Sequence, residues 1–256
     1  MKSCTTETET TLIVAHRGAS ADAPENTIPA FLLAWEQGAD AIEGDFFITA
    51  DNEIVCIHDR ATGRVAKEEL VVSESTLAQL QQLDVGAWKG EQWKGTTIPT
   101  IAQVFALVPE GKKILVEVKS GPELLPRLYE EIDQSGLKTE QIVVISFNAD
   151  VIREFKQQRP QHKAFWLSGF RKLDGGELVP DLTTVLNVLK ETGANGLSSH
   201  HGLITPELIK EILANGYEYH VWTVNDPARA HELIQFGAMS VTTDVPLLVR
   251  EYLGKH

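Results

Sequence analysis

Two acidic residues, Glu43 and Asp45, stand two positions apart in a mostly apolar segment, residues 42–48. In a β-strand, residues i and i+2 point to the same face, so the two carboxylates project together. Buried ionised carboxylates cost several kcal/mol unless a cation or hydrogen-bond donors compensate them. A bound divalent metal ion is the most specific way to compensate the two charges, because same-face acidic pairs attract cations. Ion pairs with Arg17 and Lys119, without a metal, remain the alternative.

Further reactive side chains end or follow strand-like runs elsewhere in the chain. These residues are His16, Arg17, His58, Glu117 and Lys119. If they meet at one rim, three carboxylates, two histidines and two cations form a coherent site. Each has an ordinary structural explanation by itself; His58, for example, could cap a turn. Their conjunction is what predicts the site.

Strand-like and helix-like segments alternate along the chain, as parallel βα units require. Strand-like runs begin at Leu12, Ala41, Ile114, Gln141, Lys163, Gly196, Tyr219 and Met239. Helical patterns lie at residues 28–35, 122–134, 149–157, 182–191, 206–215 and 227–236. Eight strands in 256 residues predict an α/β fold, a (β/α)8 TIM barrel. Active sites of such barrels lie at the C-terminal ends of the strands, which is where the reactive residues fall.

One segment after the second strand, at about residues 47–99, interrupts this alternation. Its tryptophans, Trp88 and Trp93, and its apolar spacing favour a small folded insertion over one end of the barrel. Residues 1–11 are rich in Thr and Glu and lack the apolar core of a secretory signal. We expect residues 1–11 to be a disordered leader and residues 12–256 to form a single domain.

Composition narrows the function classes. A net charge of −13 argues against a surface that binds the phosphate backbone of nucleic acid and against a cationic membrane-binding face. No apolar run approaches the roughly 18 residues of a membrane span. We therefore expect a cytoplasmic protein without stable membrane association, and a homo-oligomer is compatible with the sequence. Cys4 lies in the leader and Cys56 in an apolar strand, so no disulfide is expected.

Other residues near strand ends are weaker candidates. His200 and His201 end the sixth strand and could reach the rim, whereas His220, early in the seventh, is expected to pack inside. Trp222 and Asn225 near the end of the seventh strand are placed to close over a ligand. A core position explains Trp222 equally well.

Six short motifs occur in order along the chain. They are His16-Arg17-Gly18, Pro24-Glu25-Asn26-Thr27, Glu43-Gly44-Asp45, His58-Asp59, Glu117-Val118-Lys119 and Trp222-Thr223-Val224-Asn225. Together they resemble the motifs of the glycerophosphodiester phosphodiesterase family of bacterial, cytosolic type, over about residues 12–253. Two departures stand out. Gly44 occupies a position where these proteins commonly have an apolar residue, and the segment after Asp59 lacks a Thr/Asn-Gly pattern often seen there.

The resemblance implies a TIM barrel with an insertion after the second strand. It also implies hydrolysis of glycerophosphodiesters, such as glycerophosphocholine and glycerophosphoethanolamine, to sn-glycerol 3-phosphate and an alcohol. Carried onto matching positions, it implies the following roles: Glu43, Asp45 and Glu117 would hold Mg²⁺ or Ca²⁺, His16 and His58 would be the acid/base pair, and Arg17, Lys119 and Trp222 would contact the substrate.

The chemistry of a phosphodiester agrees with these roles. Hydrolysis builds charge on the phosphoryl oxygens and on the leaving alkoxide, so it requires cations at the first and a proton donor at the second. Which histidine is the acid, and whether the nucleophile is water or a substrate hydroxyl, stays open.

Two other functions could use the same rim. A lysophospholipase D or phospholipase C-like phosphodiesterase would need an apolar lip for an acyl chain, for which Trp88 and Trp93 are candidates. The acidic net charge disfavours such a membrane substrate. A non-catalytic polyol-phosphate-binding module would need no acid/base pair, so the two histidines count against it.

Overall fold

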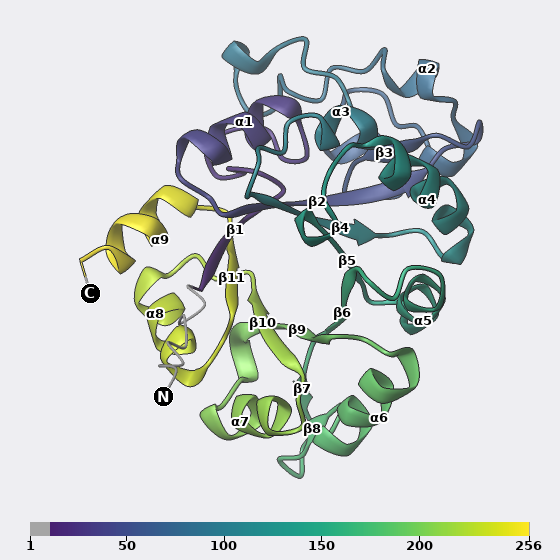
Figure 1. The fold of residues 1–256 in the computed structure, drawn as a ribbon. Coiled ribbons are helices and arrows are strands. Elements are labelled where there is room, and N and C mark those ends of the chain that lie inside the picture. Colours follow the sequence, from purple (N-terminus) through teal and green to yellow (C-terminus); the bar gives the residue numbers. More distant parts are fainter. Residues whose placement is uncertain (1–10, 256) are drawn as a thin grey trace, which may run out of the picture.

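The computed structural model describes residues 11–255 and has a closed barrel of eight parallel strands at its centre. Figure 1 looks along this barrel, with the helices arranged around it. The barrel strands are β1 (Leu12–His16), β2 (Ala41–Ile48), β4 (Lys113–Val118), β5 (Ile142–Ser146), β6 (Lys163–Ser168), β9 (Gly196–His200), β10 (Glu218–Trp222) and β11 (Ser240–Thr243). Pairing of β1 with both β2 and β11 closes the barrel. The predicted (β/α)8 TIM barrel is confirmed.

The outer helices are α1 (Ile28–Glu36), α3 (Ile101–Phe105), α4 (Leu125–Gln134), α5 (Ala149–Gln158), α6 (Leu182–Thr192), α7 (Pro206–Ala214), α8 (Pro227–Phe236) and α9 (Pro246–Leu253). Most of the outer helices begin at a capping side chain; α4 and α9 do not. Thr27, Asn148 and Asp181, for example, each accept a hydrogen bond from a backbone N–H in the first turn of the following helix. Helix α9 was not predicted from the sequence. Its Leu247 and Leu248 are 45% and 51% exposed, so its apolar residues do not follow one face.

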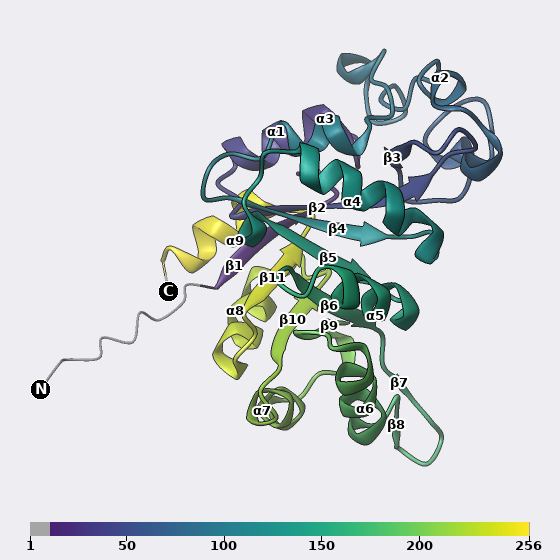
Figure 2. The same ribbon diagram turned by 45° about the vertical axis from the view of Figure 1, so that its right-hand side comes forward.

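An insertion follows the second barrel strand. Strand β2 pairs with β3 (Ile54–Cys56) in an antiparallel hairpin, and the chain then runs through short turns and helix α2 (Leu77–Leu80) before α3. Figure 2 shows this segment projecting beside α1 and α3. It has an apolar cluster of its own: Phe47, Val55, Ile57, Val65, Val72, Leu80, Leu83, Val85 and Ile98.

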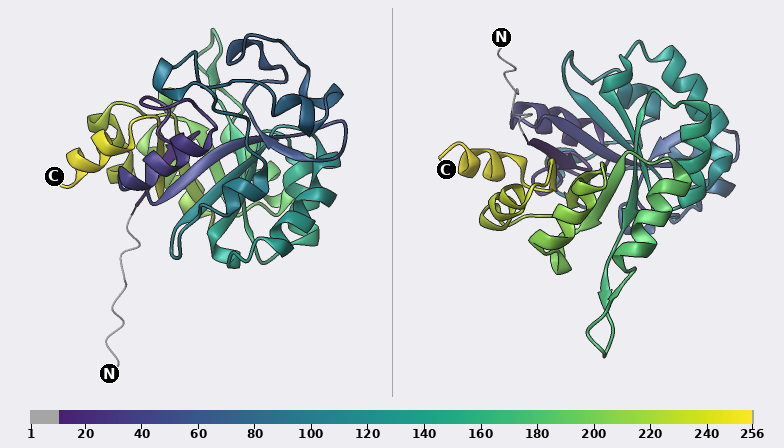
Figure 3. Two further views of the ribbon diagram at one scale, coloured as in Figure 1. Left: turned by 90° about the horizontal axis from the view of Figure 1, so that it is seen from above. Right: turned by 60° about the horizontal axis from the view of Figure 1, so that its bottom comes forward.

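A second excursion was not anticipated. Strands β7 (Arg171–Lys172) and β8 (Leu178–Val179) form a small hairpin between β6 and α6. The right-hand view in Figure 3 shows this green segment projecting from the barrel. Its strands are only two residues long and its loop is polar, so neither hydrophobic periodicity nor length marks it in the sequence.

Several sequence-based expectations stay predictions. The leader and Cys4 lie outside the described residues, and the domain boundary at residue 12 stays a prediction too. Cys56 is a free, buried thiol. Within residues 11–255, no helix has the length and apolar character to cross a membrane.

The barrel interior is filled by a compact apolar cluster: Val14, Ala41, Leu115, Val143, Ile145, Phe165 and Leu167. Leu115, Ile145 and Leu167 of this cluster also line a cavity at the C-terminal ends of the strands. The cluster therefore forms an apolar floor beneath the charged rim.

Candidate active site

Strand register brings the three predicted carboxylates together. Asp45 on β2 lies directly beside Glu117 on β4, and Glu43 lies two residues before Asp45 on the same face. One oxygen of each carboxylate lies within 4.8 Å of the others. Glu43 is 2% exposed and Asp45 is 1% exposed, so two of the three carboxylates are buried, and Glu117 is partly buried.

Asp45 is the best compensated of the three. Asn26 Nδ2 donates a 2.8 Å hydrogen bond to Asp45 Oδ2, and Arg17 Nε lies 3.1 Å from the same oxygen. Lys119 Nζ lies 3.3 Å from Asp45 Oδ1 and 2.8 Å from Glu117 Oε1. Burial alone would raise the pKa of Asp45, but the charges of Arg17 and Lys119 lower it. The ion-pair alternative thus describes Asp45 and Glu117 in this structure.

Glu43 is compensated far less. Its Oε2 accepts a 3.0 Å hydrogen bond from the backbone N–H of Arg17, but its Oε1 is buried and has no hydrogen-bond partner among the described residues. Burial and the negative charge of Asp45 raise the pKa of Glu43 to about 8. Burial and Asp45 also raise the pKa of Glu117. A donor set of three carboxylates with one unpartnered oxygen fits a hard divalent cation such as Mg²⁺ or Ca²⁺.

His16 ends β1 in register with Glu43 and is held by a carboxylate from the far end of the chain. Its Nδ1 lies 2.7 Å from Asp244 Oδ1. Asp244 also accepts hydrogen bonds from Ser20 Oγ at 2.9 Å and from Asn225 Nδ2 at 2.6 Å. Burial alone would lower the pKa of His16, but the hydrogen bond to Asp244 and the charge of Glu43 raise it. The pKa of Asp244, which burial would raise, falls to about 2 because His16 and Asn225 donate to it.

His58 follows β3 and has a matching partner. Its Nδ1 lies 2.7 Å from Asp59 Oδ1. Arg64 of the insertion donates from Nε to Asp59 Oδ2 at 2.5 Å and from Nη1 and Nη2 to Glu25 at 2.8 and 2.7 Å. Burial lowers the pKa of His58; the charge of Asp45 raises it, and the nearby cations Arg17 and Lys119 oppose that rise.

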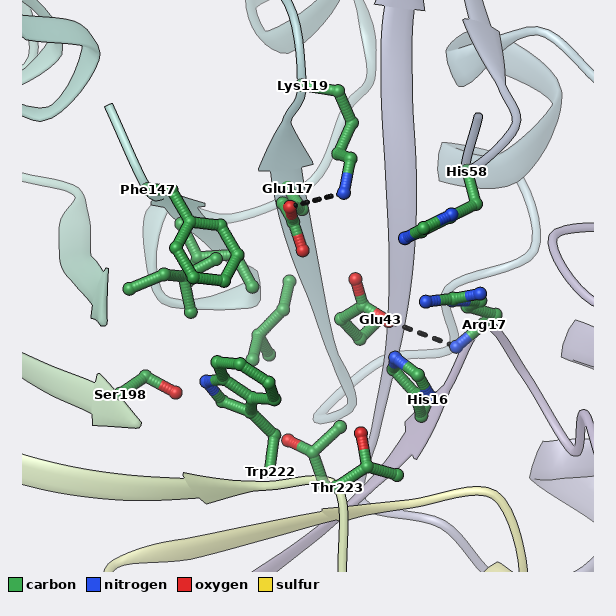
Figure 4. A pocket seen from close by; sticks show the side chains of 14 residues that line it. His16, Arg17, Glu43, His58, Glu117, Lys119, Phe147, Ser198, Trp222 and Thr223 are labelled. Atoms are coloured by element: carbon green, nitrogen blue, oxygen red, sulfur yellow. Dashed lines mark hydrogen bonds and ion pairs between the residues drawn. The ribbon is translucent and has the colours of Figure 1, made fainter. Parts of the chain in front are cut away.

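These groups surround one cavity of about 170 Å³. Figure 4 shows His16, Arg17, Glu43, His58, Glu117 and Lys119 facing it, with Phe147, Trp222 and Ser198 on the other side. The rings of Phe147 and Trp222 meet edge to face, with centroids 5.6 Å apart. The cavity therefore has one charged side and one apolar side, and the predicted Trp222 lies on the apolar side.

The loops after β1 explain why the first two motifs have their residue types. Arg17 and Asn26 both adopt left-handed backbone conformations, with φ of 55° and 57°. A Cβ atom on Gly18 would lie 2.5 Å from the carbonyl carbon of Ala30, so only glycine lets α1 approach the end of β1. The side chain of Asn26 binds both the backbone N–H and the carboxylate of Asp45. The loop thereby fixes the direction of a predicted metal ligand.

Gly44 points to the other face of β2. A Cβ atom at this position would lie 3.1 Å from Cys56 Sγ and 3.2 Å from the Cζ atom of Phe31. Phe31 and Cys56 thus take the space that an apolar side chain at residue 44 would need. This departure from the resembled motif is a difference in packing outside the cavity.

The remaining sequence candidates fall outside the cavity. His200 and His201 are not among the residues that line it. His220 is buried, as expected, with Nδ1 2.8 Å from Ser240 Oγ. Asn225 does not line this cavity either; it donates to Asp244 and accepts a 2.9 Å hydrogen bond from the backbone N–H of that residue.

Three residues at the site were not identified from the sequence: Asp244, Arg64 and Phe147. Asp244 directly follows the eighth strand, and a closed barrel puts that strand beside the first, so its position could have been found. Phe147 follows β5 in the same way. Arg64 lies in the insertion, where no periodic pattern predicts its direction.

Comparisons with known proteins agree with this geometry. Residues 16–248 match the sequence model of the Glycerophosphoryl diester phosphodiesterase family. A glycerophosphodiester phosphodiesterase of Caldanaerobacter subterraneus subsp. tengcongensis is 33% identical over 240 residues, which cover 92% of this chain and 95% of the relative. The enzyme of that name from Bacillus subtilis is 28% identical over 252 residues, covering 92% of this chain and 84% of the relative.

Solved structures of phosphodiesterases are also similar to this chain. An Oleispira antarctica phosphodiesterase in complex with the product sn-glycerol-3-phosphate is similar to this chain, with a TM-score of 0.86 and 25% identity, covering 95% of this chain and 96% of the other. A glycerophosphodiester phosphodiesterase from Parabacteroides distasonis is 27% identical with a TM-score of 0.77, covering 96% and 98% of the two chains. The chain therefore belongs to the glycerophosphoryl diester phosphodiesterase family.

Proposed function

We propose that the protein hydrolyses glycerophosphodiesters to sn-glycerol 3-phosphate and an alcohol, with a divalent metal ion and a pair of histidines. The observation that carries this proposal is the convergence of three carboxylates and two His–Asp pairs on one cavity. The similar Oleispira phosphodiesterase holds sn-glycerol-3-phosphate as its product. Release of sn-glycerol 3-phosphate from a glycerophosphodiester tests the proposal. Failure to release it from any such diester contradicts the proposal.

Glu43, Asp45 and Glu117 are the residues that would hold the metal, which we propose to be Mg²⁺ or Ca²⁺. When bound, the metal would supply positive charge against the phosphoryl oxygens. Arg17 and Lys119 line the same cavity and add cationic donors for those oxygens. The apolar side, with Phe147 and Trp222, would pack against the carbon chain of the substrate.

We assign the acid role to His16 and the base role to His58. In both residues Nδ1 is engaged by an aspartate, which leaves Nε2 for the substrate. The pKa of His16 is raised, so this ring retains a proton to give to the leaving alkoxide. The pKa of His58 is lowered, so this ring is neutral and can accept a proton from the nucleophile. A bound cation would lower both pKa values, because both rings line the same cavity as Glu43 and Glu117.

The assignment predicts the pH dependence of kcat/KM. Activity should fall as pH drops below the lowered pKa of His58, because the base becomes protonated, and should fall as pH rises above the raised pKa of His16, because the acid loses its proton. Profiles of the residual activity of His58→Gln and His16→Gln measure this. The first variant should lose the acidic limb and the second the alkaline limb. The reverse pattern would exchange the two roles.

Arg64 is predicted to act as a positioning residue. Arg64→Ala removes the cation that links Asp59 to Glu25, so we expect kcat/KM to fall about 10-fold to 100-fold, as for other residues that orient catalytic groups. The acidic limb of the pH profile should also move to higher pH, because Asp59 then acts on His58 without a competing cation.

Arg60→Ala is the matched control for Arg64→Ala. Arg60 is an exposed arginine in the same insertion, and none of the ion pairs among the described residues includes it. If the acidic limb of the pH profile does not shift in Arg64→Ala, Arg64 has no effect on the pKa of His58.

The apolar lip required by the lysophospholipase alternative is incomplete at this site. Trp88 lines a cavity beside His16, but Trp93 lines neither of the two cavities that include His16. This favours a diester without an acyl chain over an acyl-bearing lysophospholipid as the substrate. A cytoplasmic location and a homo-oligomeric state stay predictions from the sequence.

A further inference from the structure

A second cavity, of about 320 Å³, borders the catalytic rim and shares His16 and Arg17 with the first. It lies between the loop after β1, the insertion and the segment after β11, and is also lined by Ser20, Glu25, Trp88, Lys89, Asn225 and Asp244. None of the three clustered carboxylates lines it. We propose that this second cavity binds the departing alcohol of the diester and that Lys89 makes it select hydroxyl-rich alcohols over quaternary ammonium alcohols. The inference rests on the proposed function.

The two cavities match the two arms of a phosphodiester. In an in-line displacement, the attacking and leaving oxygens lie on opposite sides of phosphorus. His58, Glu43 and Glu117 line the first cavity, and the Asp244 carboxylate that binds His16 lines the second. His16 is therefore the histidine that borders both spaces. A leaving alcohol in the second cavity would lie next to the proton donor assigned above.

Both carboxylates in the second cavity already have partners. Glu25 Oε1 accepts from Arg17 Nη1 at 3.0 Å and also pairs with Arg64. Asp244 accepts from His16, Ser20 and Asn225. Neither carboxylate is therefore free to bind a cationic alcohol without sharing or losing these partners.

Lys89 has no carboxylate partner in the part of the chain that the structure describes. Its Nζ donates a 2.8 Å hydrogen bond to the backbone carbonyl of Ser20, and no carboxylate in residues 11–255 lies within 4.0 Å of it. An ammonium group has three protons, so donors remain for a ligand. Its positive charge favours hydroxyl oxygens and repels a trimethylammonium group in the same cavity.

Trp88 would otherwise be the natural site for a quaternary ammonium group, because aromatic faces attract such cations. Lys89 Nζ, however, already lies 5.6 Å from the centre of the Trp88 ring. A choline group at this face would have to approach the ammonium of Lys89. An inositol or glycerol group can accept hydrogen bonds from Lys89 and from Asn225 and can use the Trp88 ring as an apolar platform.

The test compares kcat/KM for glycerophosphoinositol and glycerophosphocholine in the wild type and in Lys89→Gln, Lys89→Glu and Lys89→Arg, with metal present. The wild type should prefer the inositol diester by about tenfold, as a single like-charge repulsion near the surface would give. Lys89→Gln should remove most of this preference, and Lys89→Glu should reverse it because choline then meets an anion. Lys89→Arg retains the charge and should retain the preference.

Lys67→Glu is the matched control, because Lys67 is an exposed lysine of the same insertion that does not line the second cavity. It should leave the substrate ratio unchanged. A purely structural role of Lys89 would lower both rates together and leave the ratio unchanged, and that result would overturn the inference, as would a wild-type preference for glycerophosphocholine. If Lys89→Glu does not fold, Lys89→Gln alone decides. Failure of the proposed function is distinguishable, because then the wild type hydrolyses neither diester.

Discussion

Replacing His16 by alanine is expected to lower kcat/KM for glycerophosphodiester hydrolysis by about 10²-fold to 10⁴-fold, the usual contribution of general acid–base catalysis. The ring is held by Asp244 at 2.7 Å and has a raised pKa, so its loss removes the proton donor for the leaving alkoxide. His58→Ala should have an effect of similar size through loss of the base. Circular dichroism should show that both variants are folded. Steady-state release of sn-glycerol 3-phosphate measures the effect.

A change of leaving group separates the two histidines. A diester of glycerol phosphate with p-nitrophenol has an acidic leaving group that needs little protonation. His16→Ala should therefore lose much less activity on this substrate than on glycerophosphocholine, whereas His58→Ala should lose about as much on both. His201→Ala, a histidine outside the cavity, is the control and should retain activity. Near-normal turnover in both His16→Ala and His58→Ala would sink the acid/base assignment.

Glu43→Gln is expected to lower kcat by about 10³-fold or more, because metal stabilisation of developing charge is worth several kcal/mol. Glu43 Oε1 is the buried oxygen without a partner, so this variant removes the charge that we expect the metal to meet most directly. Turnover with added Mg²⁺ or Ca²⁺ measures the loss. Glu177→Gln, an exposed carboxylate between β7 and β8, changes the net charge equally and should have no effect.

Although Glu43→Gln should lower kcat, it should make the metal-free protein more stable than the wild type near neutral pH. The pKa of Glu43 in the folded state, about 8, lies above its ordinary value of 4.5. The folded state thus holds a proton that the unfolded state lacks, so this contribution to stability is present below pH 4.5 and is lost as pH rises through about 8. In EDTA, Glu43→Gln should lose less stability than the wild type between about pH 6 and about pH 8, since glutamine carries no charge. Thermal unfolding measures the difference. Equal pH dependence in both proteins would show that Glu43 carries no burial cost.

The features that could be predicted from the sequence are those encoded locally. Alternating strands and capped helices indicate the barrel, and the two-residue spacing of Glu43 and Asp45 places both on one face. Because active sites of TIM barrels lie at the C-terminal ends of the strands, His16 and Glu117 could be expected beside them. Their roles stay predictions.

The features that could not be predicted depend on contacts between distant segments. The position of Asp244 beside β1 follows from barrel closure, but its hydrogen bond to His16 depends on how the two side chains point. Arg64 reaches Asp59 and Glu25 through the irregular path of the insertion, which has no repeating pattern. Asp45 is well paired, whereas Glu43, although equally buried, has an oxygen without a hydrogen-bond partner among the described residues. This difference depends on where single side-chain donors lie, such as Asn26 on its left-handed turn.

The most direct measurement is ³¹P NMR of glycerophosphocholine and glycerophosphoinositol incubated with protein that has been stripped with EDTA and then supplied with Mg²⁺ or Ca²⁺. We predict no turnover in EDTA and, after metal addition, a single phosphorus product, sn-glycerol 3-phosphate. Unimpaired turnover in exhaustive EDTA would contradict the role of the carboxylate cluster. Formation of phosphocholine or inositol phosphate, or no product with any metal, would contradict the proposed reaction.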